Sequence, residues 1–395
     1  MSLSHLTTPA PDGILKLMRA FAEDPRPGKI DLGVGVYRTE TGATPIMAAV
    51  KAAERTLLED ETTKSYVGLA GDPAFLEAVR TLTLGPSVAQ ARIAAIATTG
   101  GTAAVRHAFD LHRIAAPAGR VWMSEPTWPN HPAILAAVGQ PTHVYRYLDR
   151  AAGALDRDGM LQDLQGLQPG DALLLHGCCH NPSGVDLALP DWQQLAALCA
   201  SREVLPIVDL AYQGFAVGLE DDVAGLRALA AAVPEMLLCV SGSKNFGLYR
   251  ERVGALLAVT PGGSARETTA AHLMTFNRLS YTFPPDHGAR LVTMVLGDPG
   301  LRALWQSELA GMRDRVNAMR VALAQALRAE TGSDRFGALA DHRGMFSLLP
   351  ATPDQMERLR VEHGLYAVAD GRINVAGLTP DNVGAAARAI ATVLR

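Results

Sequence analysis

Short apolar segments that alternate with polar loops and helical patterns constrain the fold of this chain most strongly. Strand-like apolar runs cover residues 93–99, 121–123, 172–175, 205–208 and 236–240. Helical patterns follow the first and third of these runs, at residues 103–112 and about 190–201. Strand, loop and helix in this repeated order predict an α/β fold, in which helices cover a mostly parallel central sheet.

The two ends of the chain differ from this central region. A long amphipathic helix is predicted over about residues 301–328, and the segments around 345–348 and 372–376 predict a smaller α+β unit behind it. The first 40 or so residues contain many prolines and few regular signals. We therefore expect one large unit built on the sheet and a smaller C-terminal unit.

Composition and charge exclude several classes of protein. The net charge of −4 and the lack of a long basic block argue against a nucleic-acid partner. No apolar run approaches the roughly 20 residues of a membrane span, and no secretory signal is evident, so we expect a cytoplasmic protein. The four cysteines fit buried, reduced thiols better than a disulfide or zinc site, so no metal is expected.

Lysine is rare in this chain, and one lysine stands apart. Of 36 basic residues only five are lysines, and Lys244 is the only lysine after Lys64. Arginine supplies positive charge equally well, but only a lysine amine can lose its proton and attack a carbonyl. The alternative is a chance surface lysine. Because Lys244 follows a buried-strand pattern and small hydroxyl residues, we expect a nucleophile.

Possible anion ligands gather in the loops near this lysine. Gly100, Gly101 and Thr102 stand between a strand and a helix, where backbone N–H groups and the helix N-terminus favour negative charge. Ser241, Ser243 and Arg252 flank Lys244 and can bind the same anion. Each feature alone has an ordinary alternative, namely a tight turn or a solvated arginine.

Three further residues suit a planar, nitrogen-containing ligand. Asp209 ends a predicted strand, where a carboxylate can hold a pyridine nitrogen protonated. Trp128 can form one wall of a slot, and His131 can orient Asp209. Taken singly, these residues also fit a helix cap, a core tryptophan and a core histidine. Together with the amine and the anion ligands, they match pyridoxal 5′-phosphate.

Five segments of the sequence resemble the aspartate/aromatic aminotransferases, which are class I aminotransferases of fold type I, with the pattern of bacterial aromatic aminotransferases. The resemblance runs from about residue 12 to the C-terminus. It implies an N-terminal arm and part of the small domain over residues 1–41, a large cofactor-binding domain over 42–311, and a small domain over 312–395. The segments are DLGVGVY (31–37), HGCCHNPSG (176–184), DLAYQGF (209–215), SKNFGLY (243–249) and RINVAG (372–377).

The resemblance implies a role for each residue around the cofactor. Lys244 forms the Schiff base, the internal aldimine, and then moves the proton. Tyr212 and Asn181 bond the phenolic oxygen, while Asp209 pairs with the ring nitrogen. The remaining cofactor ligands implied are His131 and Trp128 at the ring, and Gly100, Gly101, Thr102, Ser241, Ser243 and Arg252 at the phosphate, with Tyr66 from the other subunit.

The resemblance also implies a homodimer with shared active sites and a set of substrate ligands. Arg372 grips the substrate α-carboxylate in a bidentate pair, which lysine cannot copy. Arg278 crosses the dimer interface to meet a dicarboxylate side chain. Gly35, Trp128 and Asn181 complete the substrate site.

Departures from the family pattern leave the substrate balance open. Phe283 stands where aspartate-selective members commonly have asparagine, and residues 282–285 and 341–346 are similar to bacterial aromatic aminotransferases. Val36, Thr44 and Thr102 are more similar to the aspartate enzymes. The resemblance therefore implies ping-pong transamination of aromatic amino acids and aspartate with 2-oxoglutarate. The alternative is a strict aspartate aminotransferase.

Two other classes on the same fold are less consistent with the sequence. Arg278 and Arg372 together indicate a site for a dicarboxylate, which argues against a β-lyase or a decarboxylase. A cofactor-binding regulator needs a DNA-binding module, and the chain has no spare basic segment to supply one.

Overall fold

The computed structural model describes residues 3–8 and 13–394 and is built around one seven-stranded sheet. The strands lie in the order β2, β10, β9, β8, β7, β3, β4, and only β10 runs against the direction of the other six. The strands are β2 (Ile93–Thr99), β3 (Val121–Glu125), β4 (Thr142–Arg146), β7 (Ala172–His176), β8 (Leu205–Leu210), β9 (Met236–Ser241) and β10 (Val253–Val259).

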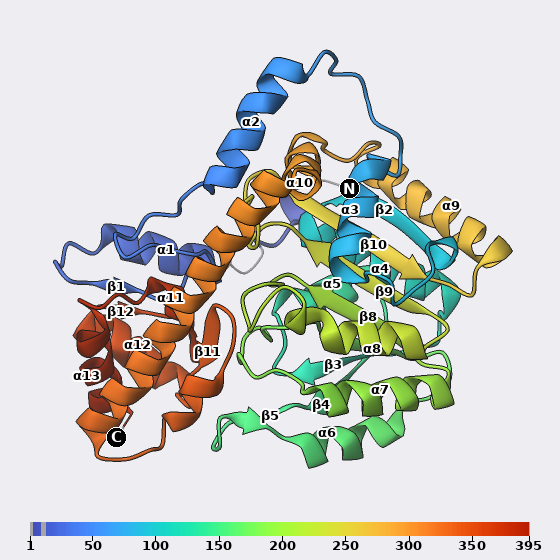
Figure 1. The fold of residues 1–395 in the computed structure, drawn as a ribbon. Coiled ribbons are helices and arrows are strands. Elements are labelled where there is room, and N and C mark those ends of the chain that lie inside the picture. Colours follow the sequence, from blue (N-terminus) through green and yellow to red (C-terminus); the bar gives the residue numbers. More distant parts are fainter. Residues whose placement is uncertain (1–2, 9–12, 395) are drawn as a thin grey trace.

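Helices cover both faces of this sheet (Figure 1). The described chain contains α1 (Gly13–Glu23), α2 (Ala48–Asp60), α3 (Pro73–Thr83), α4 (Gly100–Ala115), α5 (Asn130–Val138), α6 (Arg157–Asp163), α7 (Leu189–Arg202), α8 (Ala224–Ala232), α9 (Gly263–Ser280), α10 (His287–Gly297), α11 (Pro299–Thr331), α12 (Pro353–His363) and α13 (Val383–Val393). The predicted α/β fold with a mostly parallel sheet is confirmed.

Alternation of side chains along the strands explains why both faces are apolar. In β10, Leu256 and Ala258 join one buried cluster with Phe109 of α4, whereas Ala255 and Leu257 join a second cluster on the other face. Successive side chains of a strand point to opposite faces, so a strand buried on both sides needs an unbroken apolar run. The run from Val253 to Val259 meets that requirement.

A smaller unit is formed by the two ends of the chain. Strand β11 (Phe346–Leu348) pairs with β13 (Arg372–Asn374), and β1 (Ile30–Asp31) pairs with β12 (Leu365–Tyr366). In Figure 1 the blue helix α1 therefore lies beside the red C-terminal elements. A further small hairpin joins β5 (Leu148–Asp149) to β6 (Ala154–Leu155).

The structure corrects some expected boundaries. The first 40 residues contain α1, which forms because its apolar residues recur at helical spacing. This helix was not predicted, because the segment around it is rich in proline. The strands β4 and β10 were also missed. Helix α11 runs unbroken through residues 311 and 312, so the expected division at that point has no visible break and stays a prediction. Residues 1, 2 and 9–12 of the expected N-terminal arm lie outside the described residues.

The loop that follows β8 is fixed by one buried carboxylate. Asp222 accepts hydrogen bonds from four backbone N–H groups, at distances between 2.7 and 3.0 Å. The four donors belong to Gly214, Ala216, Val217 and Gly218. Asp222 therefore holds the loop directly after Tyr212.

No helix in the described part of the chain has the length and hydropathy to cross a membrane.

We predict that Asp222→Asn destabilises the protein. An amide offers one acceptor oxygen, so two buried N–H groups lose their acceptor, at about 1–3 kcal/mol each. The control is Asp221→Asn, because Asp221 is exposed. Thermal unfolding should show a clearly lower melting temperature for Asp222→Asn than for Asp221→Asn, and equal melting temperatures would contradict the prediction.

Candidate active site

The carboxyl ends of the parallel strands converge on one cavity of about 140 Å³. The loops that follow β2, β3, β7, β8 and β9 all contribute to its wall, and Arg252 enters just before the antiparallel strand β10. The lining residues are Gly101, Thr102, Trp128, His176, Cys178, Asn181, Asp209, Ala211, Tyr212, Ser241, Ser243, Lys244 and Arg252.

The side chain of Lys244 is half-buried and lines this cavity. Its Nζ lies 4.8 Å from the centre of the Tyr212 ring. Burial lowers the pKa of Lys244 below that of a free lysine; the negative charge of Asp209 opposes this shift, and the positive charge of Arg252 adds to it. A lowered pKa makes the unprotonated, nucleophilic amine more available near neutral pH.

Asp209 stays ionised although it is buried. Burial alone would raise the pKa of its carboxyl, but the hydrogen bond from His131, at 3.1 Å, and the nearby positive charge bring the pKa below the ordinary value. His131 is itself buried, and its other ring nitrogen lies 2.8 Å from Oγ1 of Thr127. Asp209 therefore offers a fixed negative charge to the cavity.

The N-terminus of α4 and Arg252 form an anion cradle. A side chain at Gly100 would lie 2.4 Å from the Arg252 guanidinium, and one at Gly101 would lie 2.9 Å from Cβ of Ser241. Glycine is therefore needed at both positions for these groups to come together. Backbone N–H groups, the three hydroxyl side chains of Thr102, Ser241 and Ser243, and one guanidinium can bind a phosphate here.

Arg372 lies at the junction with the smaller unit. It is buried, and its NH1 donates to Oδ1 of Asn181 at 3.3 Å. Its Nε is buried without a hydrogen-bond partner among the described residues. Burial lowers the pKa of Arg372, although not enough to remove its charge at neutral pH. Such a cation is suited to receive a carboxylate from a ligand.

Some expected site residues do not line this cavity. Tyr66 has 85 % of its surface exposed, and Arg278 is exposed in the last turn of α9. Gly35 lies instead against Phe346, and Gly100 lies against the Arg252 guanidinium of the anion cradle. All the other expected residues line the cavity, apart from His131, which contacts Asp209, and Arg372, which contacts Asn181.

Three cavity residues had not been singled out as ligands, namely His176, Cys178 and Ala211. Burial, together with the charge of His131, lowers the pKa of His176 to about 3, so this ring is neutral. His176 is the last residue of β7 and pairs in register with Asp209 of β8, so its position at the carboxyl end of a strand was the available signal.

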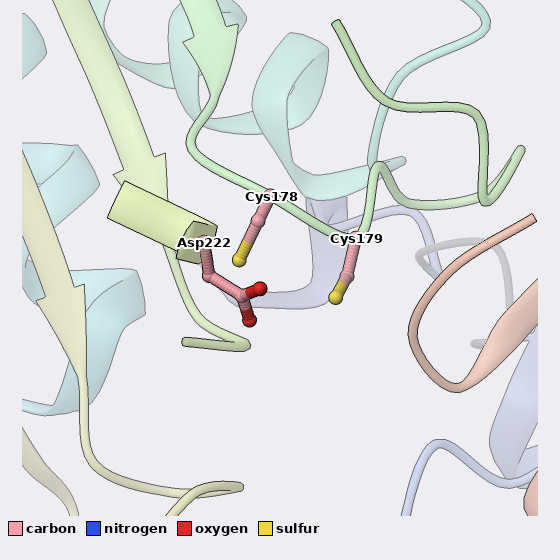
Figure 2. Close-up of side chains that lie close together, drawn as sticks. All are labelled: Cys178, Cys179 and Asp222. Atoms are coloured by element: carbon pink, nitrogen blue, oxygen red, sulfur yellow. The ribbon is translucent and has the colours of Figure 1, made fainter. Parts of the chain in front are cut away.

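Two cysteines and a carboxylate lie close together beside the cavity, as Figure 2 shows. The sulfur atoms of Cys178 and Cys179 and an oxygen of Asp222 lie within 4.8 Å of one another. Both oxygens of Asp222 already accept backbone N–H groups, and burial holds the pKa of Cys179 well above its usual value. A metal ligand must be deprotonated, so this cluster is poorly suited to bind a metal.

Comparisons with known proteins agree with this geometry. The family model for class I and II aminotransferases matches residues 27–390. An aromatic-amino-acid aminotransferase of Paracoccus denitrificans is 50% identical over 391 residues, which are 99% of each chain. An aspartate aminotransferase of Escherichia coli (strain K12) is 44% identical over 393 residues, again 99% of each chain.

A solved structure extends the similarity to the fold. The aromatic-amino-acid aminotransferase of Burkholderia pseudomallei, covalently bound to pyridoxal phosphate, superposes with a TM-score of 0.96 at 41% sequence identity. The alignment covers 100% of both chains. Sequence, fold and strand-end loops thus agree, and the chain belongs to the class I and II aminotransferases.

Proposed function

We propose that this protein is a pyridoxal-phosphate-dependent aminotransferase that acts on aromatic amino acids and aspartate. It transfers their amino group to 2-oxoglutarate in a ping-pong reaction. The observation that carries the proposal is the amine of Lys244, which shares one cavity with the ionised Asp209 and an anion cradle. The names of the Paracoccus and Escherichia relatives support both substrate classes.

The residues of the cavity fit the cofactor part by part. The cradle of Gly101, Thr102, Ser241, Ser243 and Arg252 suits a phosphate, because its donors surround the N-terminus of α4. The covalently bound cofactor named for the Burkholderia neighbour supports this assignment. Lys244 is the amine available to bond the cofactor.

The other side chains fit the aromatic ring of the cofactor. Asp209, oriented by His131, would keep the ring nitrogen protonated, and Trp128 would form one wall of the ring site. Hydrogen bonds from Tyr212 and Asn181 would hold the phenolic oxygen. When bound, pyridoxal phosphate supplies a carbonyl for the amino group and a ring that withdraws electrons from the neighbouring carbon.

Arg372 and Lys244 have different roles towards the substrate, namely binding and proton transfer. Arg372, helped by Asn181, binds the α-carboxylate and so fixes the orientation of the α-carbon. Nζ of Lys244 then accepts the proton from the α-carbon and later returns it, which its lowered pKa favours.

We further propose a homodimer in which each subunit completes the other's site. Tyr66 and Arg278 are exposed, and so are the apolar side chains of Leu58 (84 %) and Leu279 (79 %). A second copy that covered these side chains would remove apolar surface from water. The four cysteines are free and buried, which fits a reducing compartment such as the cytoplasm.

We predict that Lys244→Ala retains cofactor through the phosphate cradle but loses transamination by several orders of magnitude, because the covalent and acid–base roles vanish together. Borohydride reduction of the cofactor-loaded wild type, followed by peptide mapping, should find the label on Lys244. The control is Lys51→Arg, which changes an exposed lysine paired with Glu54 and should stay active. A label on any other lysine would refute the assignment.

Subunit mixing tests the shared site. Lys244→Ala and Arg278→Ala chains should each be inactive on aspartate as homodimers. In a heterodimer one site collects both changes and the other collects neither, so about half the wild-type activity per dimer should return. The matched control mixes Lys244→Ala with Arg372→Ala, since both residues belong to one site. Proven heterodimers without recovery would rule out the composite site.

Substrate preference is expected to depend on Phe283. Its ring stacks on Tyr66 with centroids 4.8 Å apart and an angle of 18°. Since Tyr66 and Arg278 are assigned to the neighbouring subunit's site, Phe283 would add apolar surface for an aromatic substrate there and leave Arg278 freer to move. An aromatic substrate has no second carboxylate, so burying an immobile Arg278 beside it would leave the guanidinium N–H groups without acceptors, at a cost of a few kcal/mol.

We predict that Phe283→Asn lowers kcat/KM for phenylalanine more than for aspartate, whereas Arg278→Leu does the reverse. Phe283→Leu is the control that keeps an apolar side chain and should change the ratio less. Steady-state kinetics with both substrates decides the matter. If the wild type barely turns over phenylalanine, the strict aspartate aminotransferase replaces the proposal.

A further inference from the structure

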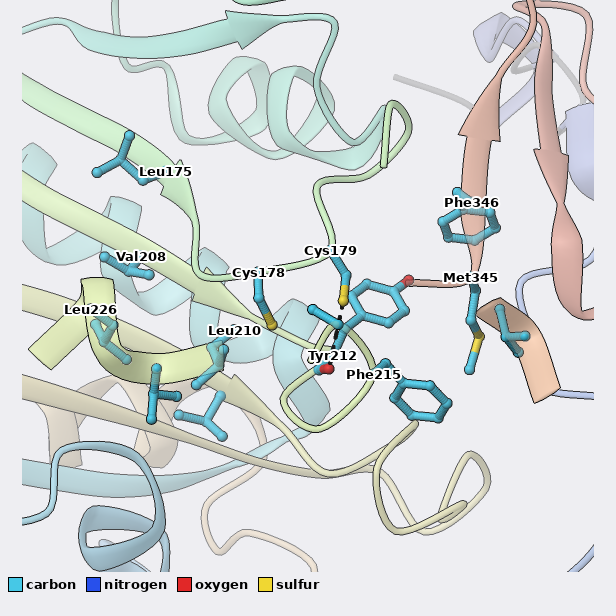
Figure 3. Close-up of a cluster of buried hydrophobic side chains, with 14 of the residues drawn as sticks. Leu175, Cys178, Cys179, Val208, Leu210, Tyr212, Phe215, Leu226, Met345 and Phe346 are labelled. Atoms are coloured by element: carbon cyan, nitrogen blue, oxygen red, sulfur yellow. Dashed lines mark hydrogen bonds between the residues drawn. The ribbon is translucent and has the colours of Figure 1, made fainter. Parts of the chain in front are cut away.

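Phe346 lies directly against the arginine that is assigned to the substrate carboxylate. Cζ of Arg372 lies 4.5 Å from the centre of the Phe346 ring, and both side chains are buried. The ring stands on β11 and faces Tyr212 across the junction between the two units (Figure 3), with centroids 6.1 Å apart at 81°. Phe346 thus contacts the site from the smaller unit.

Few polar contacts hold the Arg372 guanidinium in place. The hydrogen bond to Asn181 is long, at 3.3 Å, and its acceptor is neutral. Nε has no hydrogen-bond partner within the part of the chain that the structure describes. A cation over an aromatic face is attracted by the ring quadrupole, and the attraction is strongest where water is excluded. The Phe346 ring therefore supplies a contact that can orient the guanidinium.

We infer that Phe346 is a positioning residue, whose ring holds the Arg372 guanidinium with its N–H groups available to the α-carboxylate of every substrate. The inference rests on the proposed function, because it takes Arg372 as the carboxylate ligand. A guanidinium that is already oriented loses less conformational freedom when the substrate binds.

The ring of Phe346 is itself fixed from several sides. The backbone of Phe346 pairs with Asn374 in the β11–β13 ladder. Arg320, buried in α11, donates hydrogen bonds to the carbonyl oxygens of Gly344 and Phe346 and to Oγ of Ser347. Arg320 therefore braces the strand that carries the ring.

Gly35 closes the space on the other side of the ring. A Cβ atom at this position would lie 3.1 Å from Cζ of Phe346. This contact is tighter than ordinary van der Waals packing, so a side chain at position 35 would push the ring. Gly35 thus gives room to the Phe346 ring, and its expected contact with the substrate stays a prediction.

Weakening the contact between Phe346 and Arg372 should affect substrate binding more than the rate of the chemical step. Aromatic and dicarboxylic substrates share the α-carboxylate, so a weakened Phe346–Arg372 contact should weaken the binding of both to the same extent. Such uniform binding changes KM and leaves kcat and the preference between substrates nearly unchanged. A merely structural defect would lower kcat and the melting temperature instead.

The test changes the ring electronically while nearly keeping its shape. Phe346 is replaced by a phenylalanine with fluorine at both meta positions, which weakens the negative face of the ring. The para position stays unsubstituted because it points at Gly35. Binding of phenylpropionate, a carboxylate without an amino group, and of its neutral primary amide is measured by calorimetry on the cofactor-loaded protein.

The matched control is the same fluorinated residue at Phe336. Arg335 lies over the Phe336 ring at 5.3 Å, so the chemistry is alike, but Phe336 does not line the cavity. We expect the Kd of the acid to rise about three- to ten-fold for the variant at Phe346, while that of the amide and both values for the Phe336 control stay unchanged. KM for phenylalanine and aspartate should rise together.

An Arg372→Leu variant separates this inference from the proposed function. If Arg372→Leu abolishes the preference for acid over amide but fluorination at Phe346 does not change it, the role of Phe346 is refuted and the proposed function stands. If Arg372→Leu leaves that preference intact, the assignment of Arg372 fails, and the role of Phe346 fails with it.

Discussion

The common direction of six strands is the constraint on which the site depends. Parallel strands end at one edge of the sheet, so loops that are distant in sequence meet there, and β10 brings Arg252 to the same edge because it runs the opposite way. The strands tolerate burial on both faces because their apolar runs are unbroken. The polar groups of the site therefore gather at the strand ends and the loops that follow them, whereas the apolar parts of the strands form the core.

Burial sets the electrostatics of this edge. Loss of contact with water favours the neutral forms of both a carboxylate and an amine, yet the hydrogen bond from His131 keeps Asp209 ionised, while the pKa of Lys244 falls. The two groups therefore have opposite tasks, since one holds a charge and the other exchanges a proton. The smaller unit adds a buried charge, Arg372, which lies against an aromatic face.

Much of this arrangement could be predicted from the sequence, and the failures have physical reasons. The core of α11 was predicted because its periodic pattern is long, and β2 because the glycines at 100 and 101 follow its apolar run directly. β10 was missed because an apolar heptamer fits a buried helix or strand equally well, and α1 because prolines surround it. Lys244 was found from its isolation and its motif, but Phe346 was not, since its role arises only when β11 meets Arg372 in space.

A crystal structure of the purified protein grown with pyridoxal phosphate tests the central claim most directly. We predict electron density that joins the cofactor to Nζ of Lys244, with the phosphate between the N-terminus of α4 and Arg252. Tyr66 and Arg278 of a second copy should reach the same cavity. Cofactor density elsewhere, or a cavity completed without a second copy, would contradict the account.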